Sequence, residues 1–203
     1  MTIPVNVYAE STPNPAAMKF VCDLLLLEEG VVEFTNINEA VSCPMAQQLF
    51  AFSGVKSVFI TSNFVTVTKE SDIEWFEITN IIREFIRGYL MSGEKLFVSN
   101  PFKKETDAAS EKLEKTPAVS IPVEGQVELE EQIIQMLDEY VKPAVEQDGG
   151  AIHFRSFSNG VVTVALKGSC SGCPSSTLTL KSGIENLLKS MLPQVTEVVA
   201  EAE

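Results

Sequence analysis

An interruption near the middle of the chain divides the sequence into two parts that fold separately. In residues 103–125, charged and small side chains dominate, Pro117 and Pro122 break any regular element, and no apolar residue recurs at helical or strand spacing. Such a composition buries too little apolar surface to fold, so we expect a flexible linker. With 203 residues, the chain is long enough for two small domains. We predict one domain over residues 1–100, a linker over 101–125 and a second domain over 126–203.

The first segment has the pattern of a small domain built from strands and helices. Ser62 and Asn63 separate two β-rich runs and are typical of a hairpin turn. Ser71 and Glu74 have the spacing of a capping box ahead of an apolar stripe at helical spacing, so a helix should begin there and end before Gly93. The other predicted elements are strands over residues 5–10, 17–27, 31–35, 55–61 and 64–68, and a short helix over 44–52.

The second segment predicts a similar domain. Apolar residues recur at helical spacing up to Tyr140, and Pro143 should kink or end that helix. Asn159-Gly160 between two β-rich runs is a strong hairpin signal. The predicted elements are a helix over 129–140, a turn at 148–150, strands over 151–157, 161–167 and 195–199, and a helix from Pro174 to Pro193. We therefore predict an α/β (α+β) chain of two small domains, each a mixed or antiparallel sheet with two helices.

Composition excludes several classes of partner. Asp and Glu number 28 against 15 Lys and Arg, a formal net charge of −13, which disfavours nucleic acid or an anionic membrane as the main partner. No apolar run approaches the roughly 20 residues of a bilayer span.

The first residues lack the pattern of a signal or transit peptide, and four cysteines are too few for a disulfide-stapled secreted fold. These features predict a cytoplasmic protein, although a processed mitochondrial form would look the same.

One motif in the second segment carries metal or redox chemistry. Cys170 and Cys173 form a C-x-x-C pair between a predicted strand and a predicted helix. Two thiols at this spacing can turn toward one point, and the helix N-terminus stabilises a thiolate through its partial positive charge. Gly168 and Gly172 allow the backbone to approach a bulky group, and Pro174 fits the first turn of a helix.

Counting ligands indicates a centre shared between two chains. A zinc site or a [4Fe–4S] cluster usually needs four ligands, and the second segment offers two cysteines and a single histidine, His153. Strand alternation places His153 on one face with Ala151, Arg155 and Phe157, where it is expected to be a surface or packed side chain. Two chains would supply four thiolates. A thiol–disulfide oxidoreductase, a zinc-bridged dimerisation module and two thiols without a role are the alternatives.

The second segment strongly resembles the C-terminal domain of NifU, which the stand-alone Nfu iron–sulfur carriers share. The resemblance rests on residues 137–143, 148–150, 168–177 and 180–185. The first segment is similar to the N-terminal domain of Nfu proteins through residues 12–15, 18–20, 46–50, 54–59 and 65–69.

The resemblance implies a non-enzymatic scaffold or carrier. It would assemble a [4Fe–4S] cluster, or alternatively a [2Fe–2S] cluster, between two protomers through Cys170 and Cys173 of each. It would receive the cluster from upstream assembly proteins and hand it to apo-proteins, with the N-terminal domain used for partner or client contact. Nucleic acid and membranes are not expected partners, and we interpret Cys22 and Cys43 as packed thiols outside the motif.

Overall fold

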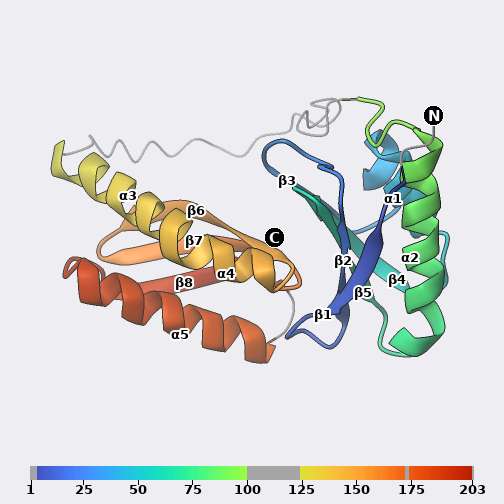
Figure 1. The fold of residues 1–203 in the computed structure, drawn as a ribbon. Coiled ribbons are helices and arrows are strands. Elements are labelled where there is room, and N and C mark those ends of the chain that lie inside the picture. Colours follow the sequence, from blue (N-terminus) through green and yellow to red (C-terminus); the bar gives the residue numbers. More distant parts are fainter. Residues whose placement is uncertain (1–3, 100–123, 172–173, 203) are drawn as a thin grey trace, which may run out of the picture.

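The computed structural model describes residues 4–99, 124–171 and 174–202, so most of the predicted linker lies outside the described residues. Figure 1 shows two sheet-containing domains, with helices α1 and α2 on one side of the first sheet and the second domain on its other side. The predicted α+β class with two small domains is confirmed. No helix in the described part of the chain is both long enough and apolar enough to cross a membrane.

The N-terminal domain is a five-stranded antiparallel sheet packed on two helices. The strand order is β1-β2-β5-β4-β3. Its elements are β1 (Val7–Ser11), β2 (Ala17–Cys22), β3 (Val31–Phe34), a 3₁₀ turn (Glu39–Ser42), α1 (Pro44–Leu49), β4 (Val55–Thr61), β5 (Phe64–Lys69) and α2 (Trp75–Ser92). Alternation along each strand turns apolar side chains such as Phe20 and Val65 toward Ile82 and Ile86 of α2, and all four are fully buried.

Two expectations for this domain are wrong. The predicted capping box does not form, because α2 begins at Trp75 and Glu74 makes no capping bond from its side chain. Trp75 Nε1 instead donates to Pro15 O at 2.9 Å and fixes the start of the helix. The second strand ends at Cys22 rather than at residue 27, since Leu26 N and Leu27 N both donate to the carbonyl of the β4–β5 turn residue Ser62. A turn made by another hairpin therefore stops the strand. The expected end of α2 is confirmed, with Gly93 in the left-handed region at φ +74°.

The C-terminal domain has a three-stranded sheet in the order β6-β7-β8. β6 and β7 pair antiparallel through a turn in which Asn159 and Gly160 both have positive φ, as predicted, and β7 and β8 pair parallel across α5. Buried side chains including Ile133, Leu166, Ile184 and Leu188 form its core. Its elements are α3 (Glu124–Met136), a π-helical turn (Leu137–Val141), α4 (Lys142–Gln147), β6 (Gly150–Ser158), β7 (Val161–Gly168), α5 (Pro174–Met191) and β8 (Glu197–Ala202).

Three details of this domain differ from the prediction. The first helix begins at Glu124, so it includes Gly125, which the sequence assigns to the linker. Pro143 was expected to kink or end the helix, and it does not end it: a π-helical turn interrupts the regular helix just before Pro143, and the chain continues as α4. A β-bulge between Phe154 and Ser156 shifts the alternation, so Phe157 packs on the core and does not share the face of His153.

Candidate metal centre

The loop that carries Cys170 lies at the carboxyl end of β7, where the chain leaves the sheet for α5. Gly168 has φ +67°, and its carbonyl accepts from Ser171 N at 3.1 Å and from Ser171 Oγ at 2.8 Å. The result is a tight turn with Cys170 inside it. β7, α5 and β8 form a β-α-β unit, and in such units the carboxyl end of the first strand is a usual place for binding sites. The predicted position of the motif between strand and helix is therefore observed for Cys170.

Cys170 is buried in this arrangement, with 6% of its surface exposed. Burial raises the pKa of the Cys170 thiol, a hydrogen bond between the thiol and the Ser169 hydroxyl partly offsets this, and the Asp148 carboxylate raises the pKa further. Gly150 lies directly against the sulfur, because a Cβ built there would be 2.7 Å from Cys170 Sγ. The thiol is thus held in its neutral form in a close-packed pocket, and proton release must accompany binding of a metal.

Of the other three cysteines, the structure describes two, Cys22 and Cys43, and both lie in the first domain. Cys173 lies outside the described residues, so its predicted pairing with Cys170 stays a prediction. Cys22 and Cys43 are buried in the N-terminal core, where burial raises the pKa of Cys22 to about 12 and that of Cys43 to about 11. Both remain thiols at neutral pH and lie where packed thiols were expected. Among the residues that the structure describes, no three His, Cys, Asp or Glu side chains gather to hold one metal ion.

His153 lies half-buried on β6 and lines a cavity of about 450 Å³ with side chains of both domains. Its Nε2 is buried and makes no hydrogen bond within the described structure. Burial lowers the pKa of His153, and positive charge on Lys167, Lys142 and Arg155 lowers it further. The Asp138 carboxylate partly offsets this lowering, and the expectation that His153 is not a ligand stays a prediction.

His153 makes folding sensitive to pH. Because its folded pKa lies below the ordinary value of 6.5, the unfolded chain binds the proton more tightly, and stability falls as the pH drops through 6.5 toward the folded value. It is the only histidine in the chain. We expect the unfolding free energy of wild type to fall relative to that of His153→Gln as the pH is lowered from about 7.5 to about 5.5. Urea unfolding at several pH values measures it, and a difference independent of pH would contradict the assignment.

The N-terminal domain packs against the loop through four polar side chains, Asn14, Lys19, Glu33 and Thr66, which we name the docking face. Asn14 Nδ2 donates to Ser169 O at 2.9 Å, and Thr66 Oγ1 donates to Gly149 O at 2.7 Å. The Gly168 amide donates to Glu33 Oε2 at 3.1 Å. Burial raises the pKa of Glu33, while this hydrogen bond and Lys167 partly lower it. All three contacts join a side chain of one domain to the main chain of the other.

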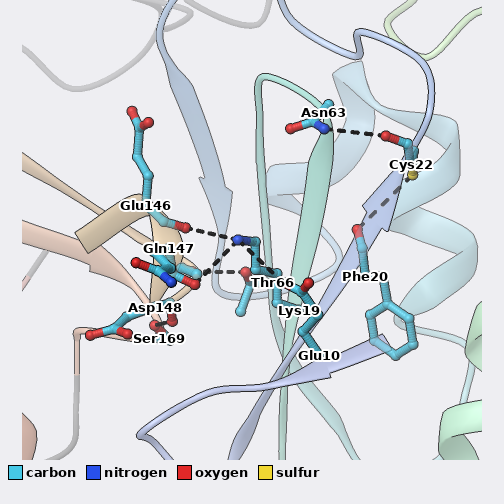
Figure 2. Close-up of polar contacts among 11 residues, drawn as sticks. Glu10, Lys19, Phe20, Cys22, Asn63, Thr66, Glu146, Gln147, Asp148 and Ser169 are labelled. Atoms are coloured by element: carbon cyan, nitrogen blue, oxygen red, sulfur yellow. Dashed lines mark hydrogen bonds and ion pairs between the residues drawn. The ribbon is translucent and has the colours of Figure 1, made fainter. Parts of the chain in front are cut away.

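Lys19 makes the most connected contact of the docking face. Figure 2 shows its Nζ donating to Glu146 O at 3.1 Å and to Gln147 O at 3.2 Å, beside the contact between Thr66 and the turn that follows α4. Its ammonium group also lies 3.6 Å from Glu10 Oε2 and 4.5 Å from the centre of the Phe64 ring. The two carbonyls are the last of α4, where the helix dipole favours a cation. The residue is only 8% exposed.

These four residues form no sequence motif and were not predicted as parts of the site. One signal was present in the strand pattern, since Lys19 and Thr66 are polar residues placed opposite the core side of their strands. Such a face normally meets water. Thr66 is instead 1% exposed, because the second domain covers it.

Comparison with known proteins finds related sequences across both domains. The family described as "Scaffold protein Nfu/NifU N terminal" matches residues 7–93, and the family described as "NifU-like domain" matches residues 133–199. The chain is 36% identical over 198 residues to NifU-like protein 4, mitochondrial, of Arabidopsis thaliana, covering 96% of this chain and 65% of that protein. It is 35% identical over 193 residues to the human NFU1 iron-sulfur cluster scaffold homolog, mitochondrial, covering 95% of this chain and 70% of that protein.

Among solved structures, the solution structure of a NifU-like protein from Saccharomyces cerevisiae is 26% identical. It matches with a TM-score of 0.42 and covers 47% of this chain and 87% of that one. The chain spans 65% of the length of the Arabidopsis relative and 70% of the length of the human relative, about two thirds in each case.

Proposed function

Because the chain belongs to the Nfu/NifU family of iron–sulfur cluster scaffold proteins, we propose that it assembles a [4Fe–4S] cluster between two protomers and transfers it to apo-proteins. The proposed ligands are Cys170 and Cys173 of each protomer. The observation that carries the proposal is the C-x-x-C pair within the matched NifU-like domain, with Cys170 in the tight turn between β7 and α5.

Ligand supply supports a centre shared between chains. Thiolates are the usual ligands of iron–sulfur clusters, and one copy of the motif offers two of them. Within the described residues no further set of donors completes a site. A cluster held across an interface is released when the subunits separate or when a client offers competing thiolates. Transfer is then ligand exchange, and the protein acts as a carrier whose cargo is the cluster, with no need for catalysis of bond cleavage.

The alternative of a thiol–disulfide oxidoreductase is less well supported. An attacking cysteine in such enzymes is accessible and has a lowered pKa. Here Cys170 is buried and its pKa is raised. A zinc-bridged dimerisation module uses the same four thiolates and is separated from the proposal by elemental analysis.

The proposed partners are a second copy of the chain, upstream cluster-assembly proteins and apo iron–sulfur proteins. The predicted cytoplasmic location has no support, since the Arabidopsis and human relatives reported above carry the word mitochondrial in their names. We propose the mitochondrial alternative in its place.

Anaerobic reconstitution with iron and sulfide tests the proposal, with both elements and the molecular mass measured on one sample. We expect about four iron and four sulfide per two chains, together with a shift in mass from monomer to dimer. About two of each per two chains would indicate the [2Fe–2S] alternative. A colourless monomer without bound iron would contradict the carrier function, and zinc in place of iron would favour the dimerisation module.

A further inference from the structure

The docking face binds main-chain carbonyls in two places, the turn between α4 and β6 and the Cys170 loop. Lys19 binds the carbonyls that end α4, and Thr66 binds the carbonyl of Gly149, which comes before β6. Asn14 binds the carbonyl of Ser169, one residue before the cysteine. The face thus recognises the main chain of two turns that meet beneath Cys170. A small apolar cluster of Val21, Phe59, Phe64 and Ala151 is buried beside these contacts, with three members from the first domain and one from the second.

Two glycines permit this close approach. Gly149 and Gly168 have φ of +82° and +67°, a region that side chains with a Cβ rarely adopt. A Cβ at Gly149 would lie 3.1 Å from Thr66 Oγ1, and one at Gly168 would lie 3.1 Å from a ring carbon of Phe59. Backbone of the second domain therefore contacts side chains of the first with no space between them. Contacts of this kind indicate a specific fit between the two surfaces.

Docking leaves little room beside the cysteine. Pro13 and Asn14 of the first domain close a cavity of about 30 Å³ over Cys170, with Leu180 of α5 as another wall. A cavity of this size admits only water-sized molecules. A cluster of several iron and sulfur atoms does not fit there. The whole Cys170 residue is only 6% exposed, which leaves little surface for the thiolates of a second chain to reach in the docked form.

We propose that the docking face is an interaction surface for the Cys170 loop of the chain's own C-terminal domain, in its described part up to Ser171, and that docking shields Cys170 until the two domains separate. In the docked form the thiol is closed to ligand exchange. In the separated form it is open to a cluster and to a second chain. Cys170 is covered by the core of its own domain, and Pro13 and Asn14 of the first domain add the cover that docking supplies. The consequence of this shielding for cluster loading rests on the proposed function.

The test compares the rate at which iodoacetamide alkylates Cys170 in full-length, cluster-free protein. A Lys19→Met/Thr66→Val double variant removes three hydrogen bonds to main-chain carbonyls and keeps the size of both side chains. Thr68→Val is the matched control, because Thr68 lies two residues along the same strand and on the same face. Mass spectrometry of peptide fragments assigns the label to Cys170 or to Cys173.

We expect Cys170 to react at least about tenfold faster in the double variant than in wild type, since each lost bond leaves a carbonyl unsatisfied in the docked form. Thr68→Val should react at the wild-type rate. Cys22 and Cys43 should stay unlabelled, which shows that the N-terminal domain is still folded. Equal rates in wild type and the double variant would overturn the proposal, as would an equal acceleration by Thr68→Val.

This readout is independent of the cluster. If wild type binds no iron yet the double variant reacts faster, the shielding holds and the carrier function fails. If wild type binds a cluster and the two rates are equal, the carrier function holds and the shielding fails.

Discussion

A Cys173→Ala variant of the full chain is expected to lose nearly all the iron and sulfide that wild type retains after anaerobic reconstitution. With one cysteine left in each motif, two chains offer two thiolates in place of the four that a cluster needs. The monomer should remain folded, with an unfolding free energy within about 1 kcal/mol of wild type, because the change removes one sulfur atom and no proposed structural contact. Iron, sulfide and far-UV circular dichroism are measured on the same preparation.

Cys43→Ala is the control for this variant, because Cys43 is also followed by a proline but lies fully buried in the N-terminal core. It should keep the full cluster content while losing some stability to the small cavity. Retention of a full cluster by Cys173→Ala would contradict the proposed ligand set. Mixed disulfides trapped through Cys170 in that variant would instead support the oxidoreductase, because the second cysteine is the one that resolves such intermediates.

Local sequence patterns predicted most of the fold. β4 agrees with its predicted bounds, and the β6–β7 hairpin follows from the Asn159-Gly160 turn, because alternation and turn chemistry are properties of neighbouring residues. The two errors in the first domain, at the start of α2 and the end of β2, occur where contacts from elsewhere in the chain decide the structure. The start of α2 depends on the hydrogen bond from Trp75 to Pro15, sixty positions earlier in the chain. No local pattern contains that information.

The candidate site also has one part that local sequence predicts and one part that it does not. The C-x-x-C pair is visible because its two members are three positions apart. The docking face could not be found from spacing, since Asn14 and the residue it binds, Ser169, are separated by 155 positions. The turn at Gly149 was predicted, but its burial against Thr66 depends on how the two domains pack. Cys170 is buried by the core of its own domain together with Pro13 and Asn14 of the first domain, so its burial does not follow from the motif alone.

The second large effect concerns Gly150, the residue packed against the sulfur of Cys170. An added Cβ there would lie 2.7 Å from Cys170 Sγ and 2.7 Å from the carbonyl oxygen of Lys167. The oxygen belongs to β7, which is held by its ladder with β6, so it cannot move away without breaking the pairing. We expect Gly150→Ala to lower the unfolding free energy of the C-terminal domain by about 2–3 kcal/mol, the usual cost of overpacking.

Gly183→Ala provides a matched comparison in the same domain. Gly183 lies in α5 with no atom within 4 Å of its added Cβ, so alanine should raise stability by up to about 1 kcal/mol through its higher helix propensity. Urea unfolding followed by far-UV circular dichroism measures both variants. Fluorescence of Trp75, the only tryptophan, follows the N-terminal domain separately. Because the same methyl group is added in both cases, opposite signs can come only from its surroundings, and an unchanged or raised stability in Gly150→Ala would contradict the close packing around Cys170.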